Sequence, residues 1–169
     1  MRRFVGFAFL FVSITLVALA EDGPGKAKTA TTACSFQDGR QISVRYEPFA
    51  VTKKKADLPL NELWPPSGSP MYLFSQASVS LGNTEIPTGA YSLYVIPEKE
   101  QWTLIINKGV NAGVPYDQQQ DLLRLPMQIG HLSEPGQHFK VVFGHIAPQQ
   151  CNMRIYYGKT GAWAEFREK

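Results

Sequence analysis

Short runs of alternating apolar and polar residues, separated by turn-forming residues, constrain the fold of this chain more than any other feature. Ile42, Val44 and Tyr46 alternate with polar neighbours, and Asp38-Gly39 just before them suits a tight hairpin turn. Turn signals recur at a spacing of roughly eight to twelve residues, which is typical of sandwiches and barrels. No segment shows a sustained helical period. The pattern predicts an all-β fold, namely an antiparallel β-sandwich of the jelly-roll kind or similar.

Residues 86–107 form the clearest unit of this pattern. Alternate residues of 91–95 predict one face of a first strand, and alternate residues of 102–106 predict one face of a second. Residues 97–100 supply the connection between them. The opposite face of the first strand, residues 92–96, is also partly apolar, so we expect this hairpin to lie centrally in the sheet.

The remaining elements follow from the same reasoning. Further strands are expected at 32–36, 71–76, 79–81, 122–127, 139–143, 151–157 and 163–166. Pro126 indicates an edge strand or a bulge, because proline donates no ladder hydrogen bond. Residues 116–123 are the one place where a short helix is expected.

The start of the chain has the pattern of a secretory signal peptide. Arg2-Arg3 precede an apolar run at 4–17, and Ala18-Leu19-Ala20 resembles a cleavage site. The apolar run is shorter than the roughly 20 residues that a membrane-spanning helix needs. Cleavage after Ala20 is therefore favoured over a membrane anchor, and no stable membrane insertion is expected afterwards.

Three segments are expected from this reading. Residues 1–20 are the signal peptide, 21–31 a flexible leader, and 32–169 a single domain. The domain is then expected to work in the periplasm or as a secreted protein.

The charge balance argues against nucleic acid as a partner. The formal net charge is +3, and it falls to +1 when Arg2 and Arg3 leave with the signal peptide. The one basic cluster, Lys53-Lys54-Lys55, is interpreted as a solvated loop.

Two cysteines remain in the mature chain, Cys34 and Cys151. In an oxidising compartment an even number of thiols favours pairing, so we expect one disulfide between them. Two buried free thiols are the alternative. A metal site is disfavoured because neither cysteine belongs to a C-x-x-C motif.

Three segments together resemble the bacterial family known as domain of unknown function 2911: the 86–107 hairpin, YDQQQDLLRLPMQ at 116–128, and the run from Ala147 to Lys169. The resemblance covers the chain from Cys34 onward and implies a secreted or periplasmic β-sandwich without naming a chemistry. Many members carry W-R-x-G-A-N-E in mid-domain. The matching residues here, 64–69, keep the tryptophan and lack the charged and amide groups.

Candidate catalytic and metal-binding residues are sparse. His138 and His145 are an odd number of residues apart on one expected strand, which would place them on opposite faces, and His131 stands alone. No G-x-S-x-G is present, and Asp117 and Asp121 are interpreted as capping or solubilising residues. We therefore predict no metal, no cofactor and no catalytic set.

Aromatic residues are numerous, and those outside the core could bind a sugar or a peptide. The irregular, proline-rich segment 64–72 makes Trp64 and Tyr72 the candidate ligand-binding residues. A purely structural role for Trp64, pinning the loop to the domain, is the competing interpretation. The sequence thus favours a non-enzymatic exported protein that binds a ligand or an envelope partner. The alternative is a hydrolase or other enzyme whose site assembles only in three dimensions.

Overall fold

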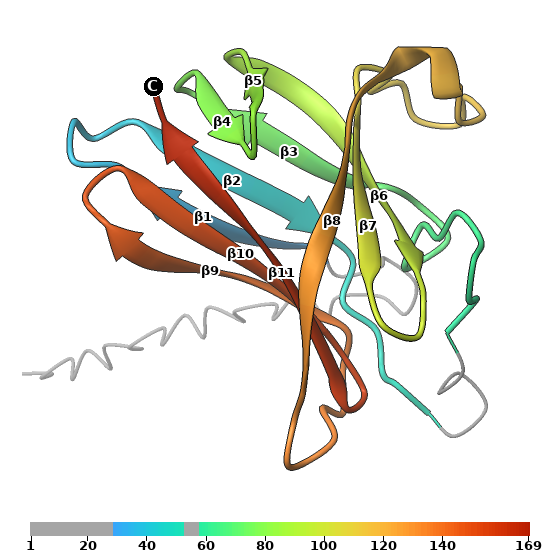
Figure 1. Ribbon diagram of the computed structural model, residues 1–169. Helices are drawn as coiled ribbons and strands as arrows, with labels where there is room; N and C mark the ends of the chain where they lie inside the picture. Colours follow the sequence, from blue (N-terminus) through green and yellow to red (C-terminus); the bar gives the residue numbers. More distant parts are fainter. Residues whose placement is uncertain (1–28, 53–57) are drawn as a thin grey trace, which may run out of the picture.

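The computed structural model describes residues 29–52 and 58–169, and within them the fold is an antiparallel sheet of eleven strands (Figure 1). The strands in chain order are β1 (Ala30–Ser35), β2 (Gln41–Tyr46), β3 (Met71–Ser75), β4 (Val79–Leu81), β5 (Thr84–Ile86), β6 (Gly89–Pro97), β7 (Trp102–Asn107), β8 (Asp121–His131), β9 (Lys140–Ala147), β10 (Gln150–Tyr157) and β11 (Thr160–Glu168). The all-β prediction is confirmed. The expected signal peptide and most of the expected leader lie outside the described residues.

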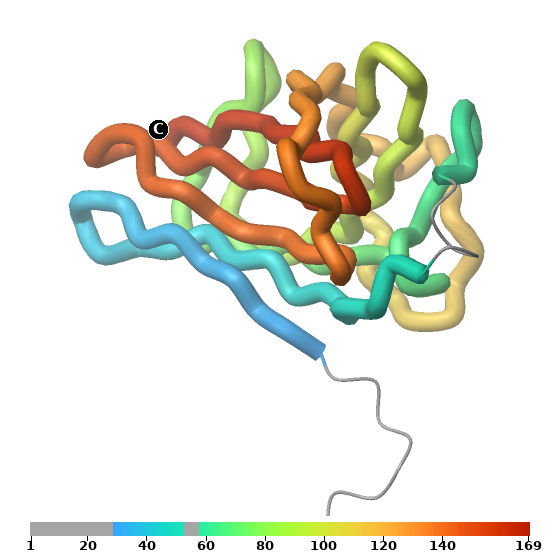
Figure 2. Tube along the Cα trace, turned by 90° about the horizontal axis from the view of Figure 1, so that it is seen from below, coloured from blue at the N-terminus to red at the C-terminus, as the bar shows by residue number. Residues whose placement is uncertain are grey.

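The strands form one path, not the two separate sheets of the predicted sandwich. Nine of them follow the order β1-β2-β3-β6-β7-β8-β11-β10-β9, and the short β4–β5 hairpin pairs with β11. The path curls until its two end strands, β1 and β9, lie side by side (Figure 2). The architecture is therefore a nearly closed, barrel-like sheet.

Strand β8 makes this closure possible because it belongs to both halves of the sheet. Its residues from Asp121 to Met127 pair with β7, whereas those from Gln128 to His131 pair with β11. Pro126 lies just before this change of partner, in the middle of the sheet and not at its edge. Alternation within one strand carries no information about such a change, which is why the sequence pattern did not separate a curled sheet from a sandwich.

The predicted hairpins are confirmed. β1 and β2 pair around the Asp38-Gly39 turn, where Gly39 has φ 88°, a value that glycine adopts without strain. β6 pairs with β3 on one side and β7 on the other, so it has the expected central position. β1 begins at Ala30, two residues before the expected start of the domain. Of the expected helix at 116–123, only a single 3-10 turn forms, η2 (Gln118–Gln120).

A buried disulfide links the end strand β1 to β10, the neighbour of the other end strand, β9. Cys34 on β1 and Cys151 on β10 are 117 residues apart in sequence and bonded, with their Cα atoms 6.3 Å apart. Both side chains are buried. Across the β1–β9 seam, the backbone N–H of Phe143 donates to Oγ1 of Thr32 at 3.1 Å. The predicted pairing is confirmed, and the bond closes the sheet at the seam.

Candidate functional site

Trp64 lies in the core. Its side chain is 9% exposed, and its ring centroid lies 5.2 Å from that of Tyr157, 5.8 Å from Phe139 and 6.0 Å from Trp102. Its backbone N–H donates to the carbonyl of Val95 at 2.7 Å. The loop therefore pairs with β6 next to the residues of β6 that pair with β3. The contacts of this ring are those of a residue that pins the loop to the domain.

Tyr72 lies away from Trp64, on the outer face of β3. The Arg45 guanidinium is 5.5 Å from the ring centroid of Tyr72 and 5.6 Å from that of Phe74. These residues line an open groove of about 410 Å³, whose other wall includes Val110. The two predicted ligand-binding residues are therefore not brought together.

The chain itself covers the neighbouring part of this outer face. We call residues 108–117 the strap. It crosses the outside of β6 and β7, where Tyr116 packs edge-to-face on Tyr94 with 5.0 Å between ring centroids. The hydroxyl of Ser92 donates to the carbonyl of Gly109 at 2.5 Å. Outward-facing residues of β6 and β7 are consequently buried.

Asn107 anchors both ends of the strap. Its side chain is 2% exposed, and its Nδ2 donates at 2.8 Å to the carbonyl of Asp117 and to Oδ1 of Asp121. Its Oδ1 accepts from the backbone N–H of Gly109 at 2.8 Å. One buried amide thus makes three hydrogen bonds, and each of them fixes the strap or the start of β8.

The two aspartates beside the strap have structural roles. Asp117 caps η2 by accepting from the N–H of Gln119 at 2.9 Å. Asp121 accepts from the Tyr116 hydroxyl at 2.6 Å and pairs with Arg124 at 2.8 Å. Burial and the hydrogen bond to Asp121 raise the pKa of Tyr116 to about 12. These carboxylates are engaged in hydrogen bonds and do not form a free catalytic pair.

The three histidines are exposed and lie apart. His131 ends β8, His138 precedes β9 in an isolated bridge with Ala50, and His145 lies within β9. Within residues 29–52 and 58–169, no group of three or more histidine, cysteine or acidic residues is placed to hold a metal ion. No helix in the described part is long and apolar enough to span a membrane.

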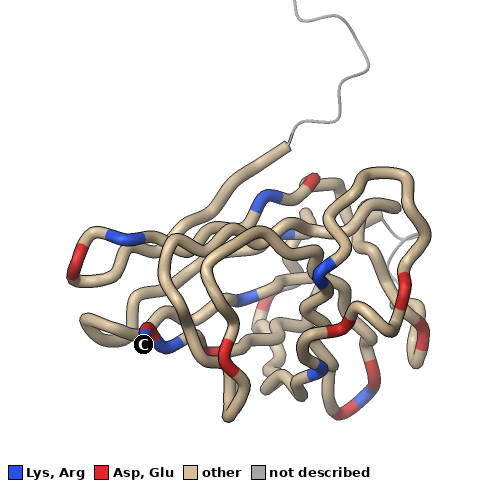
Figure 3. The backbone as a smooth tube through the Cα atoms, turned by 90° about the horizontal axis from the view of Figure 1, so that it is seen from above, with Lys and Arg blue, Asp and Glu red and all other residues tan. Residues whose placement is uncertain are grey.

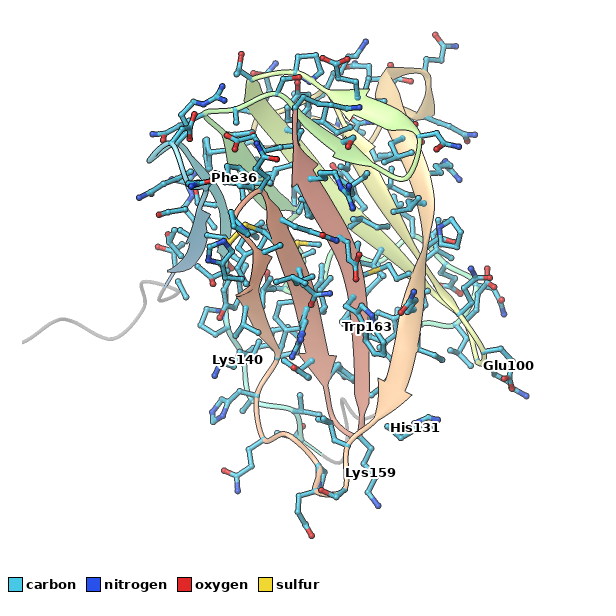
Figure 4. The ribbon with its side chains drawn as sticks, turned by 60° about the vertical axis from the view of Figure 1, so that its left-hand side comes forward. Phe36, Glu100, His131, Lys140, Lys159 and Trp163 are labelled. Carbon is cyan, nitrogen blue, oxygen red and sulfur yellow. A yellow bond between two sulfur atoms is a disulfide. The ribbon has the colours of Figure 1, made fainter. Side chains whose placement is uncertain are left out.

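The largest groove of those described lies on the other outer face, across β8, β11 and β10. We call it the outer groove; it has a volume of about 550 Å³, and its lining includes Gly130, Ile146, Asn152, Arg154, Tyr156, Trp163 and Glu165. Figure 4 shows Trp163 where β11 runs beside β8, with His131 at the end of β8. No segment of the described chain crosses this face as the strap crosses the other.

Two aromatic rings in the outer groove pack with one edge against a glycine. A Cβ atom added at Gly130 would come within 3.2 Å of the Trp163 ring, and one added at Gly161 within 3.1 Å of the Tyr156 ring. The Trp163 indole N–H donates to Oε1 of Gln128 at 2.8 Å, which restrains the ring. The glycines let the rings rest against the sheet.

Polar groups lie beside these rings. The side chain of Asn152 is 3% exposed, and its Oδ1 accepts from Nε of Arg154 at 2.6 Å. In the described part of the chain, the Asn152 Nδ2 group makes no hydrogen bond. Glu165 accepts from Gln150 at 2.8 Å through one carboxylate oxygen. The groove therefore combines aromatic faces with hydrogen-bond donors and acceptors.

The sequence pattern did not single out Tyr156 and Trp163 as candidate site residues. The only signal in the sequence was the small residues close to the aromatic ones, as in the run from Tyr157 to Trp163. The pairing of β8 with β11 brings Gly130 opposite Gly161, and no local pattern contains that information.

Charges are interspersed over the described chain and do not gather on one face (Figure 3).

Comparison with known proteins places the chain in a family. A family model described as "Protein of unknown function (DUF2911)" matches residues 27–166. Neither curated proteins nor solved structures gave a match. Because the family model covers most of the chain, this protein belongs to the DUF2911 family.

Proposed function

We propose that this protein is an exported, non-enzymatic binding module and that the outer groove is its ligand site. The observation that carries the proposal is the contrast between a groove of about 550 Å³ with aromatic and polar lining and the covered outer face of β6 and β7. Concave sites with aromatic walls and a few placed polar groups are typical of small-ligand binding.

The composition of the outer groove favours binding over catalysis. Its lining residues include no serine, threonine or cysteine that could act as a nucleophile beside His131. Arg154 and Glu165 face the groove from adjacent strands, as expected for groups that orient a ligand. An enzyme with a site assembled in three dimensions remains the alternative hypothesis.

Export is supported by the disulfide and by the predicted signal peptide. A buried Cys34–Cys151 bond is characteristic of a protein that matures in an oxidising compartment. We expect protein isolated from its native host to begin at Glu21, which intact-mass measurement would show. Retention of residues 1–20 in that protein would refute the export proposal.

The binding proposal is tested by NMR titration of isotope-labelled protein. The probes are neutral oligosaccharides, acidic oligosaccharides, dipeptides and nucleoside phosphates, each at millimolar concentration. We expect at least one class to shift the Trp163 indole N–H resonance and the backbone amides of Gly130 and Gly161. The Trp163→Ala variant should lose the shifts, whereas Phe74→Ala, which removes an aromatic ring from the opposite outer face, should keep them.

Two results would contradict this proposal. One is that no probe perturbs these resonances, or that shifts appear only around Tyr72. The other is conversion of a probe into a product during the titration, which would favour the enzyme alternative.

A further inference from the structure

We propose that the outer groove binds a neutral sugar by stacking a pyranose ring on Trp163 and Tyr156. This inference rests on the proposed function and names the ligand class for the same groove. It follows from how the aromatic rings are supported, from the polar groups beside them and from the balance of charge.

The aromatic rings are held as platforms. The Cζ3–Cη2 edge of Trp163 lies against Gly130 and the Cδ1–Cε1 edge of Tyr156 lies against Gly161, so the absence of a side chain at each glycine leaves room for the ring. The half-buried Trp163 ring lines the groove, so part of its surface is accessible there. The indole N–H donates to Gln128 at 2.8 Å, and this bond restrains the ring. The apolar face of a pyranose fits such a flat, preorganised surface.

Hydrogen-bonding groups border the platforms on the same face of the sheet. Asn152 lies opposite Glu165, and Arg154 lies opposite Trp163, in the β10–β11 register. The Asn152 Nδ2 donor is free within the described structure, while its Oδ1 holds Arg154. An apolar ligand would cover this solvent-accessible donor without giving it a partner, which is unfavourable. A ligand with hydroxyl groups satisfies it.

The groove is lined by one positive side chain, Arg154, and one negative side chain, Glu165, and this combination favours a neutral ligand over an anion. A sugar hydroxyl both donates and accepts hydrogen bonds, so it can accept from Arg154 or Asn152 and donate to Glu165. A carboxylate or phosphate would pair with Arg154 but would be repelled by Glu165. A peptide that adds to a strand edge is disfavoured, because the groove lies on a sheet face between hydrogen-bonded strands.

Tryptophan fluorescence provides a direct test. The chain has three tryptophans, and Trp64 and Trp102 are buried in the core, so Trp163 is the one at the groove. Titration with neutral hexose oligosaccharides, such as maltohexaose and cellohexaose, should shift or quench the emission to saturation. The Trp163→Phe variant should lose this signal but keep binding in calorimetry, because phenylalanine retains a stacking face.

Two glycine variants test whether sugar binding depends on the position of the Trp163 ring or only on the presence of the groove. Neither Gly130 nor Gly144 has a left-handed φ, so alanine is permitted at both. A Cβ at Gly130 meets the Trp163 ring at 3.2 Å and must displace it, whereas a Cβ at Gly144 meets nothing nearer than 4.0 Å. We expect Gly130→Ala to weaken sugar binding by about tenfold and Gly144→Ala to leave it unchanged. Thermal melts and NMR spectra verify that both variants fold.

The outcomes keep this inference distinct from the proposed function. If acidic sugars, nucleotides or dipeptides shift the groove resonances and neutral oligosaccharides do not, the sugar assignment is wrong while the binding proposal stands. Equal affinity of Gly130→Ala and wild type for a neutral oligosaccharide would overturn the stacking geometry. If no probe affects the groove, both proposals fail.

Discussion

The two outer faces of this curled sheet differ in how far the chain covers them. Over β6 and β7, the strap buries the outward side chains and joins them in a hydrogen-bond network centred on Asn107. Over β8, β11 and β10, the rings of Tyr156 and Trp163 rest on glycines and leave a groove. The same strand architecture therefore yields one face that adds stability and one that is free for recognition. Substitutions should have different consequences on the two faces.

The largest effect should come from removing the closure on which both faces depend. Replacing Cys34 and Cys151 by serine opens a loop with a sequence separation of 117 residues. In the chain-entropy account this lowers the free energy of unfolding by on the order of 4 to 5 kcal/mol. Denaturant unfolding of the double variant measures it, and wild type under reducing conditions should behave similarly. An unchanged midpoint would show that the seam holds without the bond.

A smaller loss is expected on the covered face. Asn107→Ala removes three hydrogen bonds and leaves strap groups unpaired, so we expect a loss of about 2 kcal/mol in unfolding free energy. The matched change on the open face is Gln128→Ala, which removes one exposed hydrogen bond to Trp163 and should alter stability by less than about 0.5 kcal/mol. Equal losses in urea unfolding would break the contrast between the faces.

The strap should also give the protein an alkaline limit. The pKa of Tyr116 is raised to about 12 in the folded protein from the ordinary 10.0. Because the unfolded chain loses this proton more readily, the contribution is fully present below pH 10 and is lost as pH rises towards 12. Burial also raises the pKa of Tyr91 and of Tyr94, so ultraviolet titration should detect, besides these two, a late-ionising tyrosine that is missing in Tyr116→Phe. A Tyr156→Phe variant, altered on the open face, should retain it.

The smallest effect is expected on the outside of the strap. Val114 is 59% exposed, so Val114→Ser should change the unfolding free energy by less than about 0.5 kcal/mol. A larger loss in thermal unfolding would mean that the strap is stabilised by its outer as well as its inner contacts.

Local patterns in the sequence predicted most strands, because alternation and turn residues record which face of a strand is buried. The disulfide was predictable because Cys34 and Cys151 have only each other to pair with. The change of partner along β8 was not, since it depends on pairing between residues distant in sequence. It is this change that distinguishes the curled sheet from the predicted sandwich.

The candidate site was less predictable than the fold. Trp64 follows an irregular segment and precedes two prolines, and this pattern left open whether it binds a ligand or pins the loop to the domain. Its backbone pairs with Val95, and this turns the ring into the core. The support of Trp163 by Gly130 arises from two strands separated in sequence. Such a support is visible only once the strands are paired.

The place of β11 in the strand order has a consequence for how the sheet folds. β11 lies between β8 and β10, and it follows both of them in the chain. A folding chain therefore carries two facing, unpaired strand edges until β11 is inserted, and such edges are prone to aggregate. The outer groove spans these three strands, so it does not exist before β11 is inserted. Ligand binding there would report that folding of this part of the chain is finished.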